Sequence, residues 1–144
     1  MVLHVGAKVE PMEAPSQDGR THKLDFQGVT VLYFYPKDDT PGCTKEACSF
    51  RDSLPEFIDR GVRVFGVSTD SVESHQTFAL KYSLNFPLLV DKDRAICKAF
   101  DVPAVPSAKR VTYIIADGIV VYADPAVRAE GHGADILKKI DELT

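Results

Sequence analysis

The sequence contains no long apolar stretch: none of its apolar runs approaches the roughly 18 residues that a membrane-spanning helix requires. Residues 1–8 also lack the apolar core of a signal peptide and the Arg- and Ser-rich composition of a transit peptide. We therefore expect a protein that makes no membrane contact and works in the cytoplasm, or one whose targeting segment has been removed.

An excess of basic residues is missing as well. Lys and Arg number 17 against 21 Asp and Glu, so the net charge is −4. Proteins whose main partner is nucleic acid or an anionic membrane carry a clear positive patch, and the Lys138-Lys139 pair is too short to make one. The composition therefore argues against both kinds of partner.

The usual signatures of bound metals and cofactors are absent too. The four histidines are scattered, and none has metal-ligand spacing to another histidine or to a cysteine. Gly131-His132-Gly133 is too short for a dinucleotide fingerprint, and no Gly-x-Ser-x-Gly elbow is present. We expect neither a metal nor an organic cofactor.

Cysteine is scarce: the chain has three, Cys43, Cys48 and Cys97. An odd number in a chain of this size argues against a framework of structural disulfides. In a reducing compartment, closely spaced cysteines are more often catalytic or metal-binding, and Cys43 and Cys48 are such a pair.

The residues that are present predict one α/β domain over residues 1–144, a length that suits a single hydrophobic core. Turn signals at Asp18-Gly19 and Asp117-Gly118 predict two hairpins. Apolar periodicity predicts strands over residues 29–35, 62–68, 86–90, 111–115 and 119–122, and helices over residues 41–60, 71–82, 93–100 and 134–143. Alternating strands and helices form a parallel sheet covered on both faces, and the second hairpin makes that sheet mixed. A thioredoxin-like fold fits this order.

Cys43 lies where the first long strand gives way to a helix. Thr40 and Pro41 form a helix-start signal, in which a hydroxyl cap is followed by proline at the first helical position. The backbone amides of Gly42 and Cys43 then lack intrahelical acceptors and can donate to the sulfur, while the helix dipole adds about half a positive charge at this end. Both effects favour the thiolate, which is the reactive form of cysteine.

Cys48 follows Cys43 on the same expected helix. Five residues advance about 7.5 Å along a helix axis and turn about 140°, which places the two Cα atoms roughly 8.7 Å apart. A disulfide requires a Cα separation below about 7 Å. If the two cysteines bond during function, the first turn or two of the helix must therefore unwind. Further along the same helix, Pro55 predicts a kink or a break.

The pattern Pro36-x-x-x-Thr40-x-x-Cys43 resembles the active-site motif of the peroxiredoxins, and residues 35–52 resemble the subfamily called bacterioferritin comigratory protein, or PrxQ. The resemblance extends over nearly the whole chain. It implies a thioredoxin-like fold and a cofactor-free thiol peroxidase that reduces hydrogen peroxide and organic hydroperoxides in antioxidant defence. It also implies recycling by thioredoxin or a similar dithiol.

The same resemblance implies roles for individual residues. Cys43 is similar to the peroxidatic cysteine, which attacks the peroxide and becomes a sulfenic acid. Cys48 is similar to the resolving cysteine, which condenses with that acid to an intrachain disulfide. Thr40 resembles the hydroxyl that bonds the peroxide, and Pro36 resembles the residue that shields the sulfur from water.

Two further residues of the implied site lie outside this short motif. Arg110, just before the run at 111–115, resembles the arginine that reaches the pocket from a distant strand. Glu46 resembles the carboxylate that orients that arginine. Because the resolving cysteine is in the same chain, no second subunit is needed, and we expect a monomer.

Other interpretations of these residues are open at this point. Cys43 could be an inert core cysteine, Pro36 only a strand stop, and Cys48 a packing residue. Cys97 is interpreted as a packing residue of a helix, with a backup resolving role as the alternative. For the whole protein, the alternatives are a general disulfide oxidoreductase and a non-catalytic binding protein, such as a metal carrier or a chaperone.

Overall fold

Strand β3 (Val29–Phe34) lies at the centre of a five-stranded sheet with the order β5-β4-β3-β6-β7. The computed structural model describes residues 2–143. In it, β3 runs parallel to β4 (Val62–Ser68) and antiparallel to β6 (Val111–Ala116). Strand β5 (Leu88–Val90) extends the parallel side, and β7 (Ile119–Asp124) extends the antiparallel side. The sheet is therefore mixed, as the sequence predicts.

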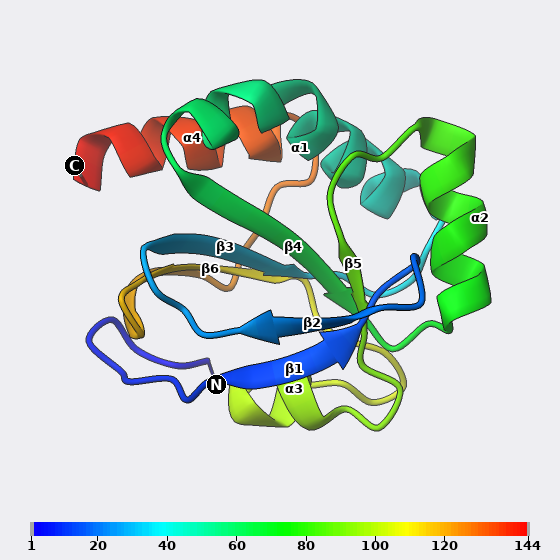
Figure 1. Cartoon of the computed structure of the whole chain (residues 1–144), viewed down its shortest axis with the longest axis horizontal. Helices are drawn as coiled ribbons and strands as arrows, with labels where there is room; N and C mark the ends of the chain where they lie inside the picture. Colours follow the sequence, from blue (N-terminus) through cyan, green and yellow to red (C-terminus); the bar gives the residue numbers. More distant parts are fainter. Residues whose placement is uncertain (1, 144) are drawn as a thin grey trace.

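Helices cover both faces of this sheet (Figure 1). They are α1 (Pro41–Asp59), α2 (Val72–Tyr82), α3 (Ala95–Ala99) and α4 (His132–Leu143). One face carries α1, α2 and α4, while α3 and a hairpin of β1 (Met12–Pro15) and β2 (Thr21–Leu24) lie against the other. None of the helices within residues 2–143 has both the length and the apolar character that crossing a membrane requires.

Each face of the sheet has its own apolar cluster. Cys43 packs with Phe50 and Phe78 in the cluster under α1, α2 and α4. Cys97 packs with Phe100 in the cluster on the α3 side. The two cysteines therefore lie on opposite faces of the sheet, separated by its backbone.

Local signals in the sequence place the turns and helix ends correctly. Asp117 and Gly118 have φ angles of 48° and 79°, as a type I′ turn between β6 and β7 requires. The Ser71 hydroxyl caps α2 by accepting the N–H of Ser74. Gly61, with φ of 70°, follows the end of α1.

Pro55 does not split α1: of the two outcomes that the sequence predicts, a kink or a break, the break was wrong, because the helix continues from Pro41 to Asp59. Proline has no N–H to offer the carbonyl of Arg51, four residues earlier. Asn85 supplies a substitute, because its side-chain amide donates to that carbonyl at 3.4 Å. The external donor offsets part of the cost of the missing helical hydrogen bond.

Helix α4 begins in close contact with α1. The N–H of Gly133 donates to the Ser49 hydroxyl at 2.8 Å. A Cβ atom on Gly133 would lie only 2.5 Å from the Ser49 carbonyl oxygen. Only glycine lets the two backbones approach this closely at this point.

Candidate active site

Cys43 is the third residue of α1 and is almost fully buried. Thr40 occupies the cap position with extended backbone, and Pro41 is the first helical residue, so the predicted helix start is confirmed. The first helical hydrogen bond runs from Thr44 N to the carbonyl of Thr40 at 2.8 Å. The amides of Gly42 and Cys43 therefore belong to the helix end that has no intrahelical acceptors.

Arg110 reaches this helix start from the residue just before β6. Its Nη2 donates to Cys43 Sγ at 3.3 Å, and its Nη1 donates to Glu46 Oε1 at 2.6 Å. Burial lowers the pKa of Arg110, but the negative charges of Glu46 and Cys43 outweigh burial and raise it. The structure thus brings together three residues that the sequence separates by up to 67 positions.

Gly42 makes room for this arrangement. A Cβ atom at that position would lie 3.1 Å from Arg110 Nη2. Such a contact is tighter than most side chains tolerate, so a larger residue would push the guanidinium away from the sulfur. Glycine at position 42 therefore gives the arginine access to the sulfur.

Glu46 is fully buried beneath Arg110. Burial raises the pKa of Glu46 to about 7, in spite of the opposing attraction of Arg110. Its second oxygen, Oε2, makes no hydrogen bond within the described residues and lies 3.9 Å from His132 Nε2. That nitrogen is 2.8 Å from the hydroxyl of Thr112 on β6.

His132 is a residue of this site that the sequence did not reveal. It starts α4 and is buried, and burial lowers its pKa, so the imidazole beside Glu46 is favoured in its neutral form. No spacing along the chain links His132 to Glu46, because the two are 86 residues apart. Only the packing of α4 on α1 brings them together.

The two other named residues of the motif are Thr40 and Pro36. The Thr40 hydroxyl makes no helix-capping bond; it donates instead to the carbonyl of Lys37 at 3.1 Å, so the prediction of a hydroxyl cap was wrong. In this orientation, the hydroxyl leaves the backbone N–H groups of the helix start available to other acceptors. Pro36 follows β3 and is half-buried, and its shielding of the sulfur stays a prediction.

All three cysteines are free thiols. Cys48 is half-buried on the intact α1, where helix geometry holds it too far from Cys43 for a bond. Cys97 is buried on the opposite face, and burial followed by its hydrogen bond to Asp91 raises its pKa. A thiol with a raised pKa is a poor nucleophile, which favours the packing interpretation of Cys97.

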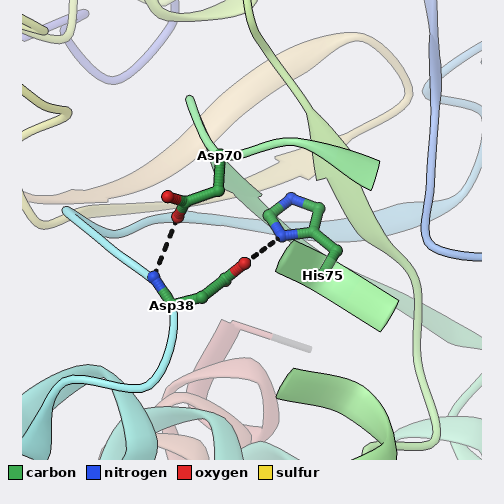
Figure 2. Close-up of side chains that lie close together, drawn as sticks. All are labelled: Asp38, Asp70 and His75. Carbon is green, nitrogen blue, oxygen red and sulfur yellow. Dashed lines mark hydrogen bonds and ion pairs between the residues drawn. The ribbon is translucent and has the colours of Figure 1, made fainter. Parts of the chain in front are cut away.

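A second polar cluster lies beside the turn that precedes Cys43 (Figure 2). His75 Nδ1 is 2.6 Å from Asp38 Oδ2, and the N–H of Asp38 donates to Asp70 Oδ2 at 2.8 Å. Within residues 2–143, this is the one group of three side chains with metal-ligand geometry. Both ring nitrogens of His75 already have hydrogen-bond partners, Asp38 and the Leu89 carbonyl, so the imidazole has no lone pair directed at a metal. Sequence spacing gave no signal for this cluster.

Comparisons with known proteins agree with this geometry. Residues 5–123 match the model of the AhpC/TSA family. The chain is 37% identical to peroxiredoxin Bcp of Bacillus subtilis, over 100% of this chain and 99% of the relative. It is 41% identical to the chloroplastic peroxiredoxin Q of Sedum lineare, over 96% of this chain and 78% of the relative.

Solved structures give the same result. The structure of peroxidoxin BcpB from Mycobacterium tuberculosis superimposes with a TM-score of 0.91 at 32% identity, and covers 99% of both chains. A structure of the Xanthomonas campestris bacterioferritin comigratory protein, described in connection with its alkyl peroxide reduction activity, has a TM-score of 0.88 at 36% identity. It covers 98% of this chain and 97% of its own.

Proposed function

Because the chain belongs to the AhpC/TSA family and is similar to peroxiredoxins along its whole length, it is a thiol peroxidase, and we propose that Cys43 is its nucleophile. One observation carries this assignment. The sulfur lies at a helix start, 3.3 Å from a guanidinium that is itself held by a buried carboxylate. A positive charge and unsatisfied amides both stabilise a thiolate.

In the first step, the Cys43 thiolate attacks one oxygen of the peroxide. An S–O bond forms as the O–O bond breaks, so the sulfur is oxidised to a sulfenic acid. The leaving oxygen takes up a proton equivalent to the one the thiol released, and departs as water or an alcohol. Arg110 and the amides of the helix start offer donors for the negative charge that develops on this oxygen.

The other residues of the motif assist this step. Glu46 orients Arg110 through its 2.6 Å hydrogen bond. The Thr40 hydroxyl can turn from the Lys37 carbonyl toward a bound peroxide, since Thr40 is the residue directly before the first helical residue of α1. Pro36, at the end of β3, limits the access of water to the sulfur.

In the second step, the Cys48 thiol attacks the sulfenic sulfur. An S–S bond forms, the S–O bond breaks, and the hydroxyl group leaves with the Cys48 proton as water. A thioredoxin-type dithiol then exchanges with the disulfide and supplies the two electrons that restore both thiols. The five-residue spacing separates this cycle from that of a general disulfide oxidoreductase, whose Cys-x-x-Cys pair bonds with its helix intact.

The substrates proposed are hydrogen peroxide and small organic hydroperoxides. Support for organic substrates comes from the alkyl peroxide reduction ascribed to the Xanthomonas relative. The intrachain resolving cysteine supports a monomer, because no second subunit has to complete the cycle. Thiols that must be reduced again in every catalytic cycle suit the reducing conditions of the cytoplasm.

Stopped-flow peroxide consumption by single-cysteine variants tests the proposal. Cys43→Ser should abolish turnover with thioredoxin as reductant. Cys48→Ser should consume one peroxide and then stall, and intact-mass analysis should find a sulfenic or sulfinic acid on Cys43. Undiminished turnover of Cys43→Ser would refute the assigned nucleophile. Reduction of insulin disulfides without peroxide consumption would favour the oxidoreductase alternative, and tight one-to-one metal binding through Cys43 and Cys48 would favour a carrier.

A further inference from the structure

A buried pair of Asp38 and His75 lies just upstream of Cys43 and has no part in the proposed cycle. The side chain of His75 is fully buried and that of Asp38 is 3% exposed, with 2.6 Å between Nδ1 and Oδ2. Figure 2 shows the two side chains pointing toward each other, His75 from the first turn of α2 and Asp38 from the turn after β3. Burial of two ionisable groups is costly, so the pair needs a physical explanation.

Hydrogen bonds hold both side chains of this pair in place. His75 Nε2 faces the carbonyl of Leu89 at 2.9 Å, and a carbonyl only accepts, so Nε2 carries a proton. Asp38 accepts from the Tyr35 hydroxyl at 2.7 Å and from the Ser74 hydroxyl at 2.8 Å, as a carboxylate does. A proton therefore lies between Nδ1 and Oδ2, and it joins the two side chains in a short hydrogen bond of 2.6 Å.

Helix α2 thus holds the turn that leads to Cys43 at two successive residues. Beside Asp38, the exposed Asp39 accepts from Lys81 Nζ and from the Tyr82 hydroxyl, both at 2.8 Å. Asp39 has a φ of 58°, a left-handed conformation that is unfavourable for most residues and needs support from its surroundings. The helix start that presents Cys43 follows directly.

We propose that the Asp38–His75 pair holds the turn before Cys43 in the conformation that reacts with peroxide. The pair thereby sets how much of the sulfenic acid is oxidised further to sulfinic acid and how much forms the disulfide with Cys48. This inference rests on the proposed function. In the held conformation, the sulfenate meets a second peroxide: another S–O bond forms, an O–O bond breaks, and sulfinate and an alcohol or water result. In the released conformation, α1 unwinds at its start, and the sulfenic acid meets Cys48 and loses water.

Weakening the hydrogen bond between Asp38 and His75 should therefore lower the fraction of Cys43 that becomes sulfinic acid and raise the fraction that forms the disulfide. In His75→Gln, the amide can still donate to the Leu89 carbonyl but no longer reaches Asp38; in His75→Asn, the amide takes the place of Nδ1 and keeps a donor to Asp38. A hydrogen bond to a charged group is strong enough to shift the release of the turn by about tenfold. His75→Gln should raise the peroxide concentration that converts half of Cys43 to sulfinic acid by about tenfold, and His75→Asn by less.

The readout is intact-mass analysis of reduced protein after single pulses of increasing hydrogen peroxide, with stopped-flow rates measured on the same samples. Ser74→Ala removes one donor to Asp38 without touching the cap of α2, and provides a mild variant that retains the ion pair. Thr77→Ala is the matched control, because its exposed hydroxyl donates within α2, to the Glu73 carbonyl.

The outcomes are distinguishable. A half-sulfinic concentration that rises in His75→Gln, rises less in Ser74→Ala and stays constant in Thr77→Ala supports the proposal. A merely structural role would lower the melting temperature and leave this concentration within twofold of the wild type in all variants, which would overturn it. Failure of the wild type to consume peroxide would instead refute the proposed function.

Discussion

Oxidation of the reduced protein by one equivalent of peroxide should unwind the first part of α1. Both cysteines lie within that helix, which is continuous from Pro41 to Asp59. Helix geometry separates their Cα atoms by roughly 8.7 Å and points them apart, against a limit of about 7 Å for a disulfide. A Cys43–Cys48 bond is therefore incompatible with the reduced conformation.

The size of the change follows from the positions of the cysteines. The segment from Pro41 to Cys48 must leave the helix, and it makes up about a sixth of the helical residues of the described chain. The hydrogen bond from Arg110 to Cys43 and that from Arg110 to Glu46 break at the same time. We expect the far-UV helical signal to fall by about this fraction.

Hydrogen exchange with mass spectrometry locates the change. Peptides that cover the start of α1 should lose protection on disulfide formation, while peptides of β3 at the sheet centre should keep it. Cys48→Ser, treated in the same way, should keep its protection because no disulfide can form. A mapped Cys43–Cys48 bond in a protein with undiminished helical signal and unchanged protection would refute the geometric argument.

Three further predictions concern single residues. Burial raises the pKa of Glu46 from 4.5 in the unfolded chain to about 7, so the folded state binds the extra proton and the contribution of Glu46 to stability falls as pH rises through this range. The free energy of unfolding, measured with denaturant, should fall by about 2 kcal/mol between pH 5 and pH 8 in the wild type but not in Glu46→Gln. An equal change in both proteins would contradict the raised pKa of the buried carboxyl. Cys97→Ser should turn over peroxide within about twofold of the wild type but lose about 1 kcal/mol of stability, because a hydroxyl replaces a thiol in an apolar cluster; a stall after one peroxide would make Cys97 the resolving residue. Gly133→Ala should lower the melting temperature by about 5 °C, since its Cβ would overlap the Ser49 carbonyl, and an unchanged melting temperature would show that α4 can move at no cost.

Much of the fold could be predicted because its signals are local. Thr40-Pro41 starts α1 and Asp117-Gly118 turns β6 into β7, each within a few residues. The break that Pro55 predicts does not occur, and Asn85, which lies 30 residues further along the chain, donates to the carbonyl of Arg51 that proline leaves without its helical partner. A sequence pattern carries no information on that distant partner.

The candidate site divides in the same way. Cys43 could be identified from its own neighbours, whereas Arg110 came only from the family resemblance, since nothing near it marks it as special. His132 and the Asp38–His75 pair could not be found at all. These contacts depend on how α4 and α2 pack, and tertiary packing brings together side chains that have no fixed spacing along the chain.

The close approach of Gly133 to Ser49 divides α1 at the residue after Cys48. Behind that point, Phe50, Leu54 and Phe57 are packed beneath α4, and melting them would expose the core. In front of it, the start of α1 buries only the small side chains Cys43 and Ala47 in the same cluster, and Arg110 holds it by hydrogen bonds to Cys43 and Glu46. If Cys43 and Cys48 bond as proposed, the contact with α4 should therefore stop the unwinding of α1 at Ser49 and keep the larger apolar side chains behind it packed.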